Sequence, residues 1–102
     1  MNSVKISGTL LNDVQLYYTP AGQAVVNFNL QTLSCGGHGQ TAIWRNFIPV
    51  IALGKIAEEC SQHLKKGNKI FVEGKLHSRN YNTLDGERKI VLEVLAEKIE
   101  PA

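Results

Sequence analysis

This sequence has no long apolar run and little cysteine. No apolar stretch approaches the ~20 residues that a membrane span needs. The opening Met1–Lys5 leads into no apolar run of the kind that a signal peptide carries. The 2 cysteines are too few for a disulfide framework, so we expect reduced thiols. These absences together predict a cytoplasmic protein.

The chain is also too short for two domains. A chain of 102 residues buries about 65% of its unfolded surface, which is enough for one core and too little for a cofactor domain beside a substrate domain. Disorder is excluded because 43% of the residues are hydrophobic. The net charge of +2 says little about the ligand, because a nucleic-acid binder needs clustered charge more than total charge. We expect one domain over residues 1–102.

Strand-like patterns cover most of the chain. Apolar and polar residues alternate over residues 4–10, 24–33, 70–81 and 90–99, which is the period of half-buried strands. Residues 14–18 form a short extended segment, and the mostly apolar residues 42–53 predict a long strand in which Pro49 indicates a bulge or an unpaired edge. Thr19–Gly22 and Asn82–Gly86 have the composition of turns, and the glycine-rich residues 34–41 predict a loop.

The period changes after Gly54. Four apolar residues then fall at helical spacing, and a basic last turn with a glycine stop follows in Lys65–Gly67; the four are Ile56, Ala57, Cys60 and Leu64. We therefore expect one helix among several short strands. This order predicts an all-β fold, a five-stranded Greek-key barrel of the oligonucleotide-binding type, with one α-helix between the third and fourth main strands.

The strand after the helix carries the most informative face. If Ile70, Val72 and Leu76 point into the barrel, the opposite face presents aromatic and cationic residues, in the order Phe71, Glu73, Lys75, His77, Arg79 and Tyr81. Unpaired nucleic acid binds by stacking its bases on aromatic rings along a basic groove. The alternative is a solvated strand face whose charges happen to alternate, with Tyr81 packed on a neighbouring loop.

The third main strand offers Trp44, Arg45 and Phe47 to the same surface. Alternation places Trp44 opposite Arg45 and Phe47, so all three share one surface only if a bulge near Pro49 breaks the period. Burial in the core or a contact between subunits stays an alternative for Trp44.

A series of short motifs occurs in order over almost the whole chain: Tyr18–Phe28, Phe47–Ile48, Gly54–Glu58, Leu64–Gly67, Val72–Leu76, Arg79–Tyr81, Asp85–Gly86 and Glu93–Val94. In these motifs the sequence resembles the bacterial single-stranded DNA-binding proteins. The resemblance implies an oligonucleotide-binding fold, a homotetramer, and binding of single-stranded DNA without sequence preference in replication, recombination or repair. No enzymatic activity and no cofactor are implied.

The resemblance also implies roles for individual residues. Phe47 and Tyr81 match stacking aromatics of the family, and Arg79, Lys55 and Lys66 match basic positions near the DNA path. The residue pattern adds further candidates for bases or phosphates: Trp44, Phe71, Lys75, Arg88 and His77.

The sequence departs from the family at three points. Leu53 stands where a third stacking ring is usual, and Pro49 stands where many relatives have a polar or basic residue. The acidic C-terminal tail that recruits replication and repair proteins is missing, so we do not expect recruitment by that route.

Three other interpretations remain open. The length, the absence of the tail and Pro49–Ile51 also resemble primosomal replication protein N, a dimeric relative that acts in replication restart. Two Cys-x-x-His pairs, Cys35–His38 and Cys60–His63, have spacing that zinc accepts, although Cys60 falls on the apolar helix face, and we expect no metal. The third interpretation is a module that binds other proteins and no DNA.

Hydrolytic catalysis is not expected, because the carboxylates are scattered over the helix, the last turn and the last strand. Glu93, Glu97 and Glu100 have the spacing of a solvated strand edge. By alternation, the opposite face of this strand is expected to present Ile90, Leu92, Val94, Ala96 and Lys98 without a break in the period.

Overall fold

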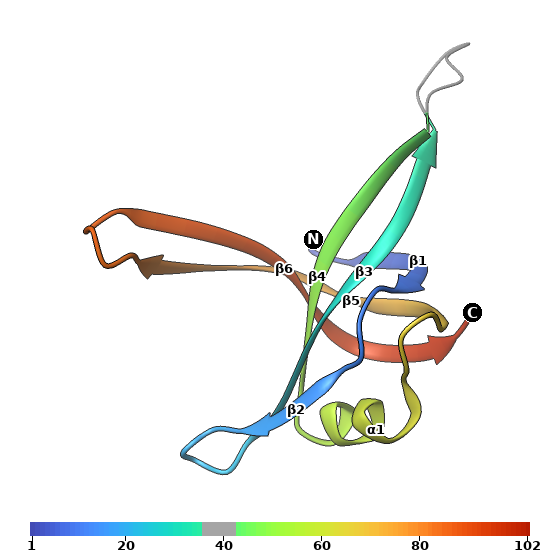
Figure 1. The fold of residues 1–102 in the computed structure, drawn as a ribbon, viewed down its shortest axis with the longest axis horizontal. Coiled ribbons are helices and arrows are strands. Elements are labelled where there is room, and N and C mark those ends of the chain that lie inside the picture. The colour runs from blue at the N-terminus through green and yellow to red at the C-terminus, as the bar shows by residue number, and fades with distance from the viewer. Residues whose placement is uncertain (36–42) are drawn as a thin grey trace.

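The computed structural model describes residues 1–35 and 43–102 (Figure 1). It contains strands and one helix, in the order β1 (Val4–Leu10), β2 (Gln15–Tyr18), β3 (Ala24–Cys35), β4 (Ile43–Leu53), α1 (Lys55–His63), β5 (Lys69–Asn82) and β6 (Arg88–Pro101). The predicted strands and helix are therefore confirmed, apart from small shifts at their ends. Of the glycine-rich loop predicted for residues 34–41, β3 takes the first two residues, and the rest lies outside the described residues.

The strands form a closed barrel. They are hydrogen-bonded in the order β1-β5-β6-β4-β3-β2, and an additional pairing of β1 with β3 closes the ring of β1, β3, β4, β5 and β6. The short β2 extends β3 as a hairpin beside the ring. A barrel of five main strands with the helix between the third and the fourth is what the sequence predicted. The Greek-key connectivity stays a prediction.

Alternation fills the barrel with small and branched apolar side chains. The core takes every second residue of the strands, and its largest fully buried side chains are Leu10, Val26, Leu30, Val50, Ile70 and Val72. Ala57 and Cys60 of α1 join this core, so the helix covers one end of the barrel as Figure 1 shows. The predicted helical face is confirmed. The helix ends at His63, however, so Lys65–Gly67 lies in the following loop.

Two pairs of strands run past the barrel as arms. The β3–β4 arm and the β5–β6 arm leave the barrel in different directions (Figure 1). Both faces of an arm therefore meet solvent. Leu76, predicted to point into the barrel, pairs with the buried Val94 but is 49% exposed, because the pairing of β5 with β1 ends at Gly74. The predicted side of the strand is therefore correct, and the predicted burial is wrong.

Pro49 causes no bulge. Residues Val25 to Cys35 of β3 pair one by one with Leu53 to Ile43 of β4, and Asn29 pairs with Pro49 within this run. Of the two predicted alternatives for Pro49, the bulge is thus wrong and the unpaired edge remains. On its other side, β4 pairs with β6 at Val50 and Ile51, so Pro49 lies just past that ladder, at the edge where a residue without an N–H is tolerated.

A register shift does occur opposite Gly74. Glu73 pairs with Lys98 while Gly74 pairs with Ala96, so β6 carries one extra residue, Glu97. Such a bulge reverses the inward face of the strand. Lys98 is accordingly exposed and Ile99 partly buried, so the predicted continuous face fails at Lys98.

The two predicted turns are present. Gly22 and Gly86 have positive φ values of 87° and 84°, which glycine adopts without strain. No helix within residues 1–35 and 43–102 is long and apolar enough to span a membrane.

Gly74 provides a test of the barrel wall. A Cβ at this position would overlap the carbonyl of Leu95 on the neighbouring strand. We expect Gly74→Ala to lower the free energy of unfolding by about 1–3 kcal/mol, the usual cost of overpacking. Urea unfolding measures the change. Ser78→Ala on the exposed arm of the same strand is the control, and equal stability of both variants would contradict the close approach.

Candidate nucleic-acid interface

One continuous outer face of the sheet carries most of the candidate residues. The strand registers place Gln15, Asn27, Ile51, Leu95 and Lys75 in one row across β2, β3, β4, β6 and β5. The next row contains Asn29, Pro49, Glu93 and His77, since Pro49 and Glu93 directly precede the paired residues of β4 and β6. Paired residues project to the same side of a sheet, so these rows form one surface.

The two arms continue this surface after they separate. Phe47 follows Pro49 at the next outward position of β4, while Arg79 and then Tyr81 follow His77 on β5. Phe47 is 61% exposed and Tyr81 is 46% exposed. An aromatic ring therefore stands on each arm, on the same side of the sheet.

A groove lies where the arms diverge. Its volume is about 340 Å³, and it is lined by residues of β2, β3, β4, β5, β6 and the loop before β2: Asn12, Gln15, Asn27, Phe28, Asn29, Pro49, Val50, Arg79, Val91 and Glu93. Four of these residues carry carboxamide side chains. The groove therefore offers both donors and acceptors of hydrogen bonds.

A buried carboxylate is hydrogen-bonded to a guanidinium in the lining of this groove. Glu93 is only 4% exposed, and its Oε1 accepts a hydrogen bond of 3.0 Å from Nε of Arg79. Nε2 of His77 lies 4.0 Å from the same oxygen. A carboxylate removed from water needs such a partner, because leaving it unpaired costs several kcal/mol. Arg79 is thus held at the groove by a neighbour that the fold buries.

The structure brings five predicted site residues onto the outer face: Phe47, Lys75, His77, Arg79 and Tyr81. Lys75 also lies 3.9 Å from Glu97, and both side chains are more than half exposed, so this ion pair is weak. The predicted row of β5 is confirmed as one side of the strand, since Ile70, Val72 and Gly74 on the other side are buried.

Trp44 and Arg88 point away from this face. Trp44 pairs with Ser34 on the opposite side of the β3–β4 arm, because no bulge shifts the register. Arg88 pairs with Asn82 on the opposite side of the β5–β6 arm. Trp44 is 61% exposed, so the alternative of core burial is wrong.

The remaining candidates, Phe71, Lys55 and Lys66, lie away from the groove. Phe71 is half-buried beside Ser7, ten residues and about 33 Å along the strand from Tyr81 at ~3.3 Å per residue. Lys55 opens α1, and Lys66 lies in the loop after it, where its backbone N–H donates to Oδ1 of Asp13 at 2.9 Å.

Sequence reasoning missed the polar floor of the groove. Glu93 was expected on a solvated edge, and that expectation is wrong because β4 and β5 flank it on both sides. The carboxamides of Asn27 and Asn29 alternate with buried residues of β3, and this regular polar row was the signal available in the sequence.

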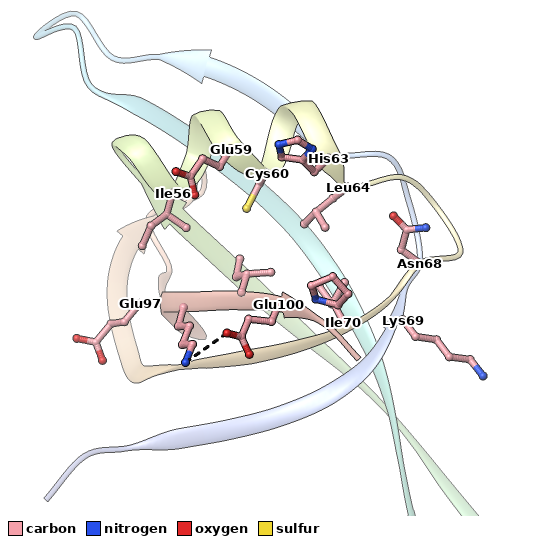
Figure 2. Close-up of a pocket in the computed structure, with 13 residues that line it drawn as sticks. Ile56, Glu59, Cys60, His63, Leu64, Asn68, Lys69, Ile70, Glu97 and Glu100 are labelled. Carbon is pink, nitrogen blue, oxygen red and sulfur yellow. Dashed lines mark ion pairs between the residues drawn. The ribbon is translucent and has the colours of Figure 1, made fainter.

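A second cavity, of about 670 Å³, separates α1 from the end of β6. Figure 2 shows Cys60 on its helical wall and Glu100 on the opposite wall. Lys98, which also lines this cavity, forms an ion pair of 3.3 Å with Glu100. Burial, followed by the charge of Glu59, raises the pKa of the Cys60 thiol to about 11, which disfavours the thiolate that zinc binds.

Of the predicted zinc pairs, His38 lies outside the described residues. Within residues 1–35 and 43–102, no three His, Cys, Asp or Glu side chains are grouped for a metal.

A closed barrel of five main strands, with rings and cations exposed along a groove, defines the class of oligonucleotide-binding domains. The family model described as the single-strand binding protein family matches residues 1–102, and the chain belongs to this family. The resemblance found in the sequence is thereby confirmed.

Several relatives align with almost the whole chain. It is 39% identical over 100 residues to single-stranded DNA-binding protein 2 of Listeria innocua, and 40% identical over 100 residues to the single-stranded DNA-binding protein of Bacillus cereus. It is 32% identical over 104 residues to the single-stranded DNA-binding protein of Corynebacterium glutamicum. These alignments cover 98% of this chain, but 63%, 59% and 46% of the three relatives. The chain thus spans about half to three fifths of their length.

Proposed function

We propose that this chain binds single-stranded DNA without strict sequence requirement and protects it during replication, recombination or repair. One observation carries the proposal: Phe47 and Tyr81 stand exposed on two arms that flank a common groove. The names of the relatives, which are single-stranded DNA-binding proteins, support the same ligand. The proposed action is binding without catalysis, and a cytoplasmic location stays a prediction.

Stacking supplies the contacts to bases in this proposal. Unpaired bases expose their faces, and every base has a π-face, so stacking on a ring tolerates any sequence. Phe47 and Tyr81 are the primary rings. Trp44 and Phe71 are secondary candidates, because Trp44 lies on the other face of its arm and Phe71 at the far end of β5.

Cations then follow the phosphates. Lys55, Lys66 and Arg88 are exposed and form no ion pair with any described residue, so their charge is available to a backbone. Lys75, His77 and Arg79 have acidic neighbours on the outer face, and a polyanion competes with these contacts for them. We assign all six to the path of the phosphates, with Arg88 as a secondary candidate because it lies on the other side of its arm.

A homo-oligomer is the second part of the proposal. Large apolar side chains are exposed on both arms: Leu33, Ile43, Leu76, Ile90 and Leu92. Exposed apolar surface of this kind marks a contact with another chain. β1 also pairs with β3 only at Thr9 and Leu10 among the described residues, so Val4–Gly8 retains an open edge.

Replacing one ring tests the stacking assignment. We expect Tyr81→Ala to lose about 1–3 kcal/mol of affinity for an oligo-dT, with little loss for duplex DNA, because paired bases cannot unstack onto the ring. Fluorescence anisotropy of a labelled oligonucleotide measures both affinities. Tyr18→Ala is the matched control, since Tyr18 is exposed on the opposite side of the sheet. Equal losses for single strand and duplex would refute stacking.

Salt dependence tests the phosphate contacts. We expect affinity for oligo-dT to fall as salt rises, and Lys75→Ala to reduce the log–log slope by about 0.7, the value for one lost contact to a single strand. Titrations at four or more salt concentrations give the slope. Lys98→Ala is the control, because Lys98 lines the cavity beside α1. A wild-type affinity that does not change with salt contradicts the whole set of contacts.

The mass in solution tests the assembly. We expect four subunits per particle in sedimentation equilibrium, and we expect Leu92→Glu to lower this number by placing a charge on the apolar face of the β5–β6 arm. Glu87→Lys in the turn serves as a charge control. A particle of two subunits would instead support the primosomal replication protein N-like alternative, and a monomer would rule out both.

A further inference from the structure

We propose that the groove between the arms holds one unpaired base, and that Glu93 and Asn29 recognise its edge, with guanine preferred over thymine. This inference rests on the proposed function, since it needs a single strand along the outer face. It adds a specificity-determining pair of residues to a surface otherwise suited to any sequence.

The groove has the size and the lining for one base. Its volume of about 340 Å³ lies at the lower end of the range for ligand sites, ~300–1000 Å³. Polar side chains dominate the lining, in contrast to the apolar rings on the arms. A polar pocket beside stacking rings suits the edge of a base whose neighbours are stacked, because an unpaired base exposes its Watson–Crick edge.

Asn29 and Glu93 approach the groove from opposite sides. They occupy one row of the sheet with Pro49 between them, so two strand spacings, about 10 Å, separate their backbones. Pro49 has no polar side-chain atom and lines the groove between them. A planar ring can therefore lie across Pro49 and meet the carboxamide with one part of its edge and the carboxylate with another.

Glu93 keeps one oxygen free for a ligand. Its Oε1 accepts from Arg79, whereas Oε2 accepts none of the side-chain hydrogen bonds formed among the described residues. None of those residues has a buried side-chain oxygen or nitrogen without a partner, so Oε2 retains contact with solvent although Glu93 is 4% exposed. Glu93 lines the groove, so we take the groove as the space from which a ligand reaches this oxygen.

Guanine fits these two groups better than thymine does. Guanine presents two adjacent N–H donors, on N1 and the N2 amino group, beside the acceptor O6. The donors match a carboxylate, which only accepts, and O6 matches the N–H of the Asn29 carboxamide. Thymine presents a single N–H between two carbonyl oxygens, and these oxygens would face the negative charge of Glu93.

The preference is compatible with general binding. One recognised base adds to several stacked bases and neutralised phosphates, so the strand binds in any sequence and shifts its register to place a guanine in the groove. The Nε of Arg79 donates to the Glu93 carboxylate and orients it, so the Nη donors of Arg79 are left for the phosphates of the DNA strand.

The experiment compares oligo-dT with the same oligomer carrying one central dG, at fixed length and salt. We expect the wild-type protein to bind the dG oligomer about five- to tenfold more tightly, the lower part of the range for a bidentate contact to a base. Deoxyinosine, which lacks the N2 amino group, should keep less than half of this gain. An equal gain with inosine or dA would assign it to stacking and overturn the inference.

Glu93→Gln removes the charge and one accepting oxygen at nearly constant shape, and we expect it to abolish the preference for dG, measured as the ratio of the affinities for the dG oligomer and for oligo-dT. Its affinity for oligo-dT is measured separately, because Glu93 also holds Arg79. Glu100→Gln is the matched control and should keep the preference, since Glu100 lies at the cavity beside α1. If Glu93→Gln does not fold, the affinities of the wild-type protein for the dG and deoxyinosine oligomers still test whether the N2 amino group is recognised. Binding to dT without any preference for dG overturns this inference alone, whereas loss of all binding to dT overturns the proposed function.

Discussion

The arrangement of the interface depends on a short parallel ladder between β4 and β6. Two residue pairs, Val50 with Val94 and Ile51 with Leu95, join segments that lie far apart in the sequence. This ladder closes the barrel on that side, and immediately past it the two strands separate into different arms. It therefore places the floor of the groove, brings Glu93 next to Pro49, and leaves the outer faces of both arms turned to the same side.

The sequence predicted the fold well wherever local patterns determine it. Alternation located the strands, helical spacing located α1, and glycines marked the turns. The errors arose where a residue's surroundings depend on distant strands. Leu76 has the alternation of a core residue but lies past the end of β1, and Lys98 follows an extra residue whose presence shows only when β5 is set beside β6. Local periodicity defines the faces of a strand, but not where its neighbours end.

The same limit explains which parts of the candidate site were found. The row from Lys75 to Tyr81 belongs to one strand, so alternation alone predicts that its members share a side. Glu93 and Asn29 become neighbours through pairings with β4, between residues that the sequence separates widely. A carboxylate in an alternating strand has no local sign of burial, and its contact with Arg79 emerges only after the barrel closes.

The extra residue of β6 also has a geometric consequence. A bulge bends its strand and increases the local twist, and this one lies opposite Gly74, where the pairing of β5 with β1 ends. The direction in which that arm leaves the barrel is therefore set by a residue count rather than by side-chain chemistry. Deleting Glu97 would restore plain alternation, with Ile99 still inward, and would swing the arm to a new angle. The width of the opening between the arms can thus change in evolution by a single-codon insertion or deletion, without any substitution in the groove.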